Sequence, residues 1–228
     1  MTTPTRLQIT PHRFFRWLLV SLVIGGIVMA LAGEWTSLYL WGFALGISGV
    51  FLYATLFVLD DDLAQERFRP PSQGADAVAL RQIRLSALAT LVFAPLDGGR
   101  LHWSATVPEL LRVIAIGVST GSFFLVVRAM MANRFFSPVI RVQGERGHGV
   151  IDRGPYAVVR HPGYFGMVLF APTTALALGS WWALIPAGIY SALILRRVFV
   201  EDRFLHANLA GYAEYAGRVR HRVIPGIW

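Results

Sequence analysis

The sequence is divided into long apolar stretches by shorter polar segments. Uncharged stretches cover residues 17–33, 38–59, 85–96 and 163–195, and residues 107–131 form a further apolar stretch with arginine near both ends. A helix needs about 20 mainly apolar residues to cross a bilayer. The second stretch has that length and the first is near the lower limit. The stretch 85–96 is short enough to be an interfacial or re-entrant piece.

The last apolar stretch is too long to be a single transmembrane helix. Its 33 residues would extend about 50 Å as one helix, whereas the hydrocarbon core is about 30 Å thick. Gly179-Ser180 lies near its middle and is a natural break. Residues 163–195 therefore predict a hairpin of two short helices, and residues 33–37 predict a tight turn between the first two spans.

The distribution of arginine decides whether residues 85–96 cross the membrane. If they do, the N-terminus, the loops 60–84 and 132–162 and the C-terminal tail all lie on one side, with 18 of the 21 arginines. If they do not, the arginine-rich 132–162 loop moves to the other side. Cytoplasmic loops carry the excess of basic residues, so the pattern predicts six spans with both termini in the cytoplasm.

The predicted fold is all-α, a polytopic membrane bundle in one domain, residues 1–228. Residues 1–131 form its N-terminal transmembrane part, and residues 132–228 form a C-terminal half with a loop, the helical hairpin and a cytoplasmic tail. The segment 60–84 is expected to be polar, beginning with Asp60-Asp61-Asp62, and Pro70-Pro71 and Gly74 are expected to break any helix in its middle.

Composition supports a membrane protein and narrows the chemistry. The chain is 55% hydrophobic and 15% charged, and it has a formal net charge of +8. The arginines lie beside apolar spans, which indicates membrane orientation rather than a nucleic-acid surface. The absence of cysteine excludes disulfides and thiolate chemistry within this sequence. The six histidines show no helical metal-ligand spacing, so no metal is expected.

The clearest polar motif is Arg160-His161-Pro162, which lies directly before the hairpin. Proline is well suited to the first position of a helix, so Pro162 is expected to begin one that contains Tyr164. The free N–H groups of that helix would lie at the membrane edge, where they could bind a carboxylate or phosphate. The motif could also simply cap a span at the head-group level.

A second polar pair follows the hairpin. Arg197 and Glu201 are four residues apart, so on a helix they share one face. They could form an ordinary surface ion pair, which contributes only a few tenths of a kcal/mol. They could equally direct both charges into a site beside the Arg-His-Pro motif.

These motifs resemble the isoprenylcysteine carboxyl methyltransferase family and, more broadly, the membrane methyltransferases that include phospholipid N-methyltransferases. The resemblance covers roughly residues 140–228 and also includes the tail motif that begins Gly211-Tyr212. It implies S-adenosylmethionine as cofactor and a cytoplasmic cofactor site formed by the C-terminal half. It further implies that Arg197 faces the substrate and that Glu201 contacts the cofactor, which makes these two residues the expected catalytic pair.

The resemblance also implies a wider set of cofactor contacts. They are Gln143, His148, Gly149, Val150, Ile151, Tyr156, Arg160, His161, Pro162, Gly163, Tyr164, Glu201 and Asp202. Many members of the family carry two glutamates where this chain has Glu201-Asp202. Tyr212 and Tyr215 would close the site from below, unless the tail is only an interfacial helix.

The expected function is methyl transfer to a lipophilic or small-molecule acceptor that reaches the site from the membrane lipids. Such a displacement requires alignment of donor and acceptor rather than a metal. A carboxylate acceptor would need no base and could pair with Arg197, whereas an amine or thiol would need Glu201 or His161 as base. The alternatives are an NADPH-dependent sterol-type reductase, which has a similar Arg-His-Pro pattern, and a non-catalytic scaffold. The arginine usage suggests the inner membrane of a bacterium.

Overall fold

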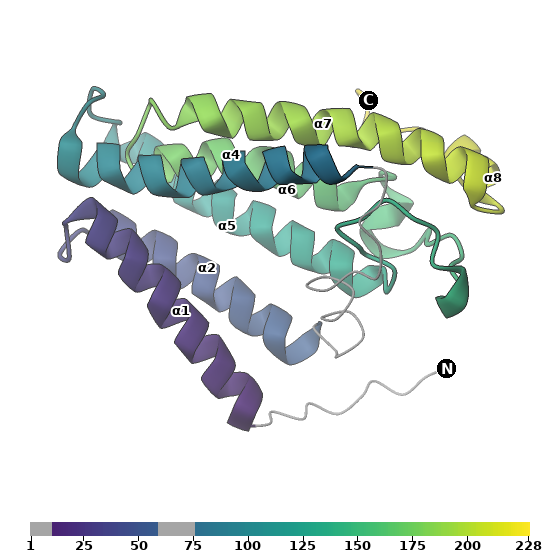
Figure 1. The fold of residues 1–228 in the computed structure, drawn as a ribbon, viewed down its shortest axis with the longest axis horizontal. Coiled ribbons are helices and arrows are strands. Elements are labelled where there is room, and N and C mark those ends of the chain that lie inside the picture. The colour runs from purple at the N-terminus through teal and green to yellow at the C-terminus, as the bar shows by residue number, and fades with distance from the viewer. Residues whose placement is uncertain (1–10, 59–75) are drawn as a thin grey trace.

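The computed structural model describes residues 11–58 and 76–228, and within them every regular element is helical (Figure 1). Six helices of 16 residues or more form the bundle. They are α1 (Pro11–Ala32), α2 (Leu38–Phe57), α4 (Ala77–Pro95), α5 (Glu109–Ala132), α6 (Pro162–Ala177) and α7 (Leu184–Asn208). A short helix, α8 (Tyr212–Arg218), follows α7.

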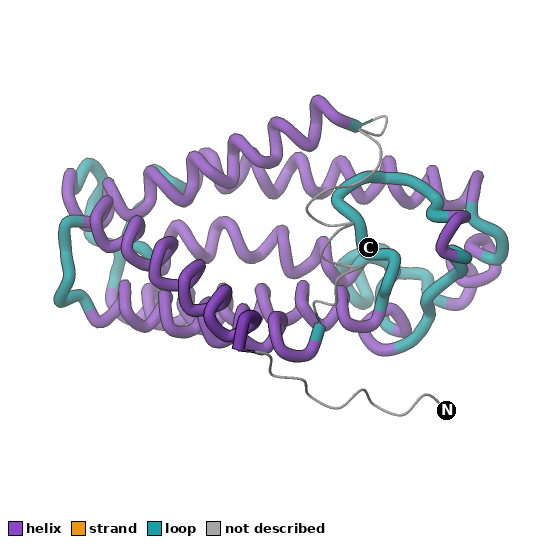
Figure 2. The backbone as a smooth tube through the Cα atoms, turned by 60° about the horizontal axis from the view of Figure 1, so that its bottom comes forward, coloured by secondary structure: helices purple, strands orange, loops and turns teal. Residues whose placement is uncertain are grey.

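The long helices run alternately up and down, so the chain's polar segments collect at one end of the bundle. Figure 2 shows the long segment between α5 and α6, mostly loop with two short 3-10 helices, beside the C-terminus at that end. Short connections join the helices at the other end, namely the turn 33–37 and the segments 102–108 and 178–183. This is the arrangement that the arginine distribution predicts when the third segment crosses. The predicted hairpin with its break at Gly179-Ser180 is confirmed, because α6 and α7 pack against each other on either side of it. Only α6 is short, since α7 continues to Asn208 and has 25 residues.

Length and composition make four of these helices able to span a bilayer, within the described part of the chain. They are α1, α2, α5 and the helical stretch from Val78 to Leu101. Large apolar side chains lie exposed along α1, among them Phe15, Leu19 and Leu22. Such a continuous exposed apolar surface is typical of a protein that contacts lipid. The helix α6 has only 16 residues, and α7 carries charged residues in its second half.

The predicted limits of the third span are wrong, because α4 begins at Ala77 and not near residue 85. The first two turns of α4 carry Arg81 and Arg84, and these charges interrupt the apolar run that the sequence shows. Arginine can belong to the end of a spanning helix when its side chain reaches the membrane surface or a polar cavity. The aspartates 60–62 and Pro70-Pro71 lie outside the described residues.

A buried carboxylate joins the connections at the end remote from the polar loops. Asp97 lies in a π-helical turn, Leu96–Leu101, and accepts hydrogen bonds from the Ser104 backbone N–H at 2.8 Å and the Ser104 hydroxyl at 2.6 Å. The hydroxyl of Ser180 donates to the same carboxylate at 2.5 Å. Gly179, the residue immediately before Ser180, adopts a left-handed φ of +89°. This cluster explains why the hairpin turns at Gly179-Ser180.

The helices α5 and α6 approach each other closely, and glycine makes this possible. A Cβ placed on Gly166 would lie 2.5 Å from the carbonyl oxygen of Ser122 and 2.8 Å from a methyl group of Val126. A Cβ on Gly163 would lie 2.7 Å from the Phe136 ring. Small residues at helix contacts are a common way to pack helices in membranes. Here they hold the start of α6, and therefore the Arg-His-Pro motif, against α5.

We predict that Gly166→Ala lowers the free energy of unfolding by about 1–3 kcal/mol, because the added methyl group forces α5 and α6 apart. The control is Gly117→Ala on α5, where a Cβ meets nothing within 4 Å. That change should be neutral or slightly stabilising, since alanine favours helix. Denaturant unfolding of both variants in detergent checks the prediction. Equal stability of the two variants would contradict the close-packing explanation.

Candidate functional site

The Arg-His-Pro motif forms the entry to α6 and is held by the C-terminal tail. His161 is the residue before the helix and Pro162 is its first residue, as the sequence predicts. The backbone N–H of Arg160 donates to the carbonyl of His221 at 2.9 Å, and that of His161 donates to the carbonyl of Arg222 at 2.8 Å. The side chains of Arg160 and His161 are both buried. The motif is therefore a packed junction rather than a head-group cap.

The carboxylate of Asp202 connects this junction to α7. Arg160 donates to it twice, from Nε to Oδ1 at 2.8 Å and from Nη2 to Oδ2 at 3.0 Å. The Nε2 atom of His161 lies 3.2 Å from Oδ1. The hydroxyl of Tyr212 donates to Oδ1 at 2.9 Å, and Nε of Arg222 donates to Oδ2 at 2.9 Å. The single buried carboxylate of Asp202 therefore contacts four side chains, which come from three segments: residues 160–161, α8 and the tail.

The remaining nitrogens of Arg160 extend the junction into the tail. Its Nη1 atom donates to the carbonyls of Val219 at 2.8 Å and Arg220 at 2.9 Å. The side chain of Tyr215 is buried beside them, and its hydroxyl donates to the carbonyl of Tyr156 at 2.8 Å. Burial raises the pKa of the Tyr212 and Tyr215 phenols well above their usual value, so both hydroxyls remain donors. The tail is therefore packed against the site, with both tyrosines buried.

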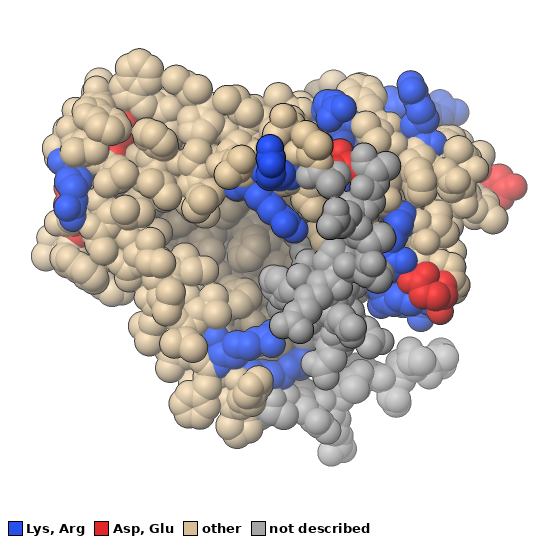
Figure 3. Space-filling view, viewed as in Figure 1, with Lys and Arg blue, Asp and Glu red and all other residues tan. Residues whose placement is uncertain are grey.

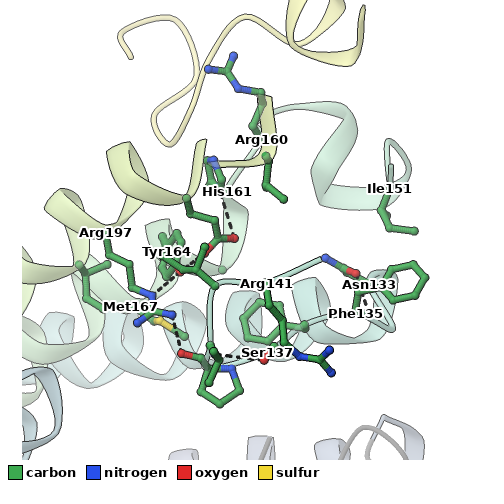
Figure 4. Close-up of a pocket in the computed structure, with 18 of the residues that line it drawn as sticks. Asn133, Phe135, Ser137, Arg141, Ile151, Arg160, His161, Tyr164, Met167 and Arg197 are labelled. Atoms are coloured by element: carbon green, nitrogen blue, oxygen red, sulfur yellow. Dashed lines mark hydrogen bonds and ion pairs between the residues drawn. The ribbon is translucent and has the colours of Figure 1, made fainter. Parts of the chain in front are cut away.

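A second polar cluster lies one turn into α6. The hydroxyl of Tyr164 donates to Oε2 of Glu201 at 2.5 Å, and it accepts a hydrogen bond from Nε of Arg197 at 2.9 Å. Arg197 and Glu201 therefore do share one face of α7, and they meet through Tyr164 rather than as a simple surface ion pair. Figure 4 shows Arg197 and Tyr164 pointing toward one another across the pocket wall. The Nδ1 atom of His161 lies 3.9 Å from Oε1 of Glu201, which joins the two clusters.

Arg197 also holds two segments that are distant in sequence. Its Nη1 atom lies 3.0 Å from Oδ2 of Asp76, the residue before α4, and its Nη2 atom donates to the carbonyl of Pro138 at 2.5 Å. The arginine therefore bonds to α6, to the start of α4 and to the loop after α5. Sequence reasoning places Arg197 toward the substrate and does not identify these partners.

Both clusters border one large cavity of about 640 Å³. Eleven of the fourteen predicted site residues line it. They are His148, Gly149, Val150, Ile151, Tyr156, Arg160, His161, Gly163, Tyr164, Arg197 and Glu201. The other three, Gln143, Pro162 and Asp202, are not among the lining residues and are buried behind the wall.

The loop before the Arg-His-Pro motif forms one wall of the cavity, and Gln143 supports it from behind. The Gln143 amide nitrogen donates to the carbonyl of Phe135 at 2.8 Å, and Nη1 of Arg146 donates to its amide oxygen at 2.6 Å. The backbone N–H of Gln143 donates to Nδ1 of His148 at 3.1 Å. The His148 ring stacks on Phe135 with centroids 4.3 Å apart. Burial lowers the pKa of this imidazole, which favours its neutral form.

The opposite part of the cavity lies between helices and is mostly apolar, although Arg84 of α4 also belongs to its lining. Ile83 and Ala87 of α4, Met167 of α6 and Tyr190 and Ile194 of α7 line it. In the view of Figure 1, the space-filling picture in Figure 3 shows the molecule hollowed below α4, with basic side chains along the edge of the hollow. The cavity thus combines a polar end near the loop between α5 and α6 with a mostly apolar end among the helices. Sequence reasoning misses the contribution of α4, because its first turns read as part of a polar loop.

Comparison with known proteins identifies a matching family model and several relatives. The family model described as phospholipid methyltransferase matches residues 110–210. The cobalt-zinc-cadmium resistance protein CzcN of Cupriavidus metallidurans is 33% identical over 138 residues, which are 58% of this chain and 57% of that protein. The match therefore spans less than two thirds of that relative's length.

Relatives from a plant and a yeast are also similar to this chain. Protein-S-isoprenylcysteine O-methyltransferase B of Arabidopsis thaliana is 27% identical, with 63% of this chain and 70% of that protein covered. The protein-S-isoprenylcysteine O-methyltransferase of Schizosaccharomyces pombe is 24% identical, with 79% of this chain and 83% of that protein covered. These matches confirm the resemblance to the isoprenylcysteine carboxyl methyltransferase family that the Arg-His-Pro and tail motifs indicate.

The buried network predicts a large difference between two aspartates. Asp202→Ala leaves Arg160 and Arg222 without their buried partner, so it should lower the free energy of unfolding by about 3–5 kcal/mol. Asp152 pairs with Arg218 at 2.9 Å on the surface, so Asp152→Ala should cost at most about 1 kcal/mol. Denaturant unfolding measures both, and limited proteolysis should cut the tail of the Asp202 variant first. A similar small cost for both would show that Asp202 does not hold the junction.

Proposed function

We propose that this protein is an integral-membrane methyltransferase that uses S-adenosylmethionine as methyl donor and acts on a lipophilic acceptor. The family resemblance supports the class of enzyme. The observation that carries the proposal is the two-ended cavity, whose polar end holds Tyr164, Arg197 and Glu201 and whose apolar end lies between helices. A polar donor and a lipid-like acceptor could meet where these ends join.

The polar end has the properties that the donor requires. A cavity of about 640 Å³ lies within the range of about 300–1,000 Å³ that is usual for small-molecule sites. The aromatic rings of Phe135, Tyr156 and Tyr212 can contact an adenine ring. The carboxylate of Glu201 lies in the lining, where it can meet the cationic part of the donor. Residues 148–151 contribute backbone groups beside Gly149, which has no side chain to obstruct a ligand.

We assign different tasks to the predicted cofactor residues. His148, Gly149, Val150, Ile151, Tyr156, His161, Gly163, Tyr164 and Glu201 line the cavity and are proposed to contact the donor. Gln143, Arg160, Pro162 and Asp202 are proposed to hold those residues in place. This division rests on which side chains face the cavity and which have their polar atoms occupied by other parts of the chain.

S-adenosylmethionine would supply a methyl group on a positively charged sulfur, a group that leaves readily as a neutral thioether. The chain would contribute alignment, which is the main requirement for such a displacement. Glu201 and His161 would hold the donor at the end of α6, while Ile83, Ala87, Met167 and Ile194 would hold the apolar part of the acceptor. Arg197 would fix Tyr164 between the two.

The same proposal gives the protein an orientation in the membrane. We propose six spans. Four are the helices that are long and apolar enough to cross a bilayer on their own, and α6 and α7 are the other two. The end that carries the cavity, the tail and most arginines would face the cytoplasm, where the donor is available. The helix α6, with 16 residues, would be the shorter member of the hairpin because it begins at the cavity, whereas α7 has 25 residues and would extend beyond the membrane at its charged second half.

The first functional prediction concerns the donor. We expect S-adenosylhomocysteine to bind the protein in detergent and to raise its unfolding temperature, because a ligand that binds only the folded state stabilises it by mass action. NADPH should have no such effect. Thermal unfolding with each compound separately is the measurement. Stabilisation by NADPH and not by S-adenosylhomocysteine would replace the methyltransferase with the reductase.

The second functional prediction concerns Glu201. Glu201→Gln should weaken the binding of S-adenosylhomocysteine by about tenfold, because a charge-assisted hydrogen bond becomes a neutral one. Glu145→Gln is the matched control, since Glu145 pairs with Arg141 at 2.7 Å and its side chain is exposed. That variant should bind like the parent. Isothermal titration of all three proteins checks this, and unchanged affinity in the Glu201 variant would place the donor elsewhere.

A further inference from the structure

The outward face of α7 changes from apolar to basic partway along the helix. Ile185 and Ile189 are exposed near its start. Arg196 and Arg203 follow on the same face, because they lie about three and five helical turns after Ile185. Both arginines are exposed, and within the described part of the chain neither forms a hydrogen bond or an ion pair with another side chain. Their charges are therefore available to a partner outside the chain.

This basic face lies on the opposite side of α7 from the cavity. Successive residues on a helix point about 100° apart, so Arg203 points about 160° away from Glu201. The same angle separates Arg196 from Ile194, and Ile194 and Glu201 both line the cavity. The neighbouring acid, Asp202, is buried. The two exposed arginines therefore do not belong to the proposed methyl-transfer site, and no acid of α7 accompanies them on their face.

Two aromatic rings and a third arginine complete the basic half of the face. Phe199 lies between Arg196 and Arg203 along the helix, is exposed, and packs on Trp228 with ring centroids 4.8 Å apart. The guanidinium carbon of Arg222 lies 5.7 Å from the Phe199 ring centroid and 5.9 Å from the Trp228 ring centroid. These distances suit cation–π contacts. Three arginines thus surround an exposed aromatic pair, and we call this surface the α7 lipid face.

The proposed placement of α7 in the membrane puts this face near the cytoplasmic surface. Along the helix axis, Arg196 is about 18 Å and Arg203 about 28 Å from the first residue of α7. In a hydrocarbon core about 30 Å thick, Arg203 would reach the surface and Arg196 would lie about 10 Å below it. An arginine at that depth needs an anionic partner or must extend toward the surface. Figure 3 shows basic side chains gathered over the second half of α7.

An apolar groove of about 610 Å³ continues from this face toward the other end of α7. Ile185, Pro186 and Ile189 of α7 and Ala89 and Phe93 of α4 are among the residues that line it. Ile189 is about 10 Å from Arg196 along the helix axis. A hydrocarbon chain whose head group lies at Arg196 would therefore enter the groove.

We propose that the α7 lipid face binds one anionic phospholipid of the cytoplasmic leaflet, with its phosphate at Arg196 and Arg203 and an acyl chain in the groove. The inference rests on the proposed membrane placement and goes beyond the proposed activity, since the lipid is a bound ligand and not the methyl acceptor. Charge complementarity selects an anionic head group, because the exposed charges of α7 on this face are both positive. The apolar groove selects a lipid rather than free phosphate.

The test adds lipids to the detergent-solubilised protein and counts the bound molecules by native mass spectrometry. Dioleoyl phosphatidylglycerol and dioleoyl phosphatidylcholine have the same chains and differ in the net charge of the head group. We expect the parent protein to bind one phosphatidylglycerol about tenfold more tightly than phosphatidylcholine, because each arginine near the surface attracts an anionic lipid. The double variant Arg196→Gln/Arg203→Gln should lose this preference and should keep its affinity for phosphatidylcholine.

The matched control is the double variant Arg153→Gln/Arg218→Gln, which removes the same two charges elsewhere on the surface. Arg153 is exposed, and Arg218 pairs with Asp152 on the surface. This control should keep the preference for phosphatidylglycerol. An equal fall in both double variants would overturn the site in favour of general attraction to surface charge, and a parent without the preference would also overturn it. Displacement of the lipid by equimolar inorganic phosphate would refute a lipid as the occupant.

Ile189→Ser tests the groove, because it replaces an exposed apolar side chain in the lining. It should weaken the binding of both lipids by about fourfold, since they share the same chains. Unchanged affinity for both would refute the placement of the chain. S-adenosylhomocysteine should bind all these variants as it binds the parent, because none of the changed residues lines the cavity. Failure of the parent to bind it would refute the proposed function, whereas the lipid ratio tests the α7 lipid face separately.

Discussion

The geometry of the site depends on the buried carboxylate of Asp202. Arg160, His161, Tyr212 and Arg222 all direct a polar atom to it, and these residues come from the start of α6, from α8 and from the tail. A buried charge is tolerated only when it is paired and hydrogen-bonded. Each of these segments therefore depends on the others for its position in the fold. The junction forms as one unit, although Arg160 and its partner Arg220 are 60 residues apart in sequence.

Close packing between α5 and α6 supplies the second constraint. Gly163 and Gly166 allow the start of α6 to lie directly against Phe136, Ser122 and Val126. The position of Tyr164 follows, because it lies between the two glycines on the same helix. The polar network fixes the helix end, and the glycines fix its distance from α5. A site at a membrane surface needs both, since lipid supplies no hydrophobic force that would press the helices together.

Much of this arrangement could be predicted from local patterns in the sequence. The uncharged stretches indicate the helices, Pro162 marks the start of α6, and the spacing of Arg197 and Glu201 places them on one face of α7. The start of α4 could not be predicted, because Arg81 and Arg84 interrupt the apolar pattern, and Arg84 is explained only by the cavity that it lines. The partners of Arg197 could not be predicted from the sequence either. Asp76 and Pro138 are 121 and 59 residues away, and no periodicity connects them.

The neighbouring acids Glu201 and Asp202 show why residue type alone cannot assign roles in this site. Successive residues on a helix point about 100° apart, since 3.6 residues complete one turn. Glu201 consequently reaches the cavity and Tyr164, while Asp202 points into the junction and has its oxygens occupied by Arg160, Arg222 and Tyr212. The shorter aspartate matches the short distance to the Arg160 guanidinium. A longer glutamate there would have to fold its additional methylene into a packed network. The difference between the two acids is therefore a consequence of position, and it divides one acidic pair into a structural residue and a residue that faces the cavity.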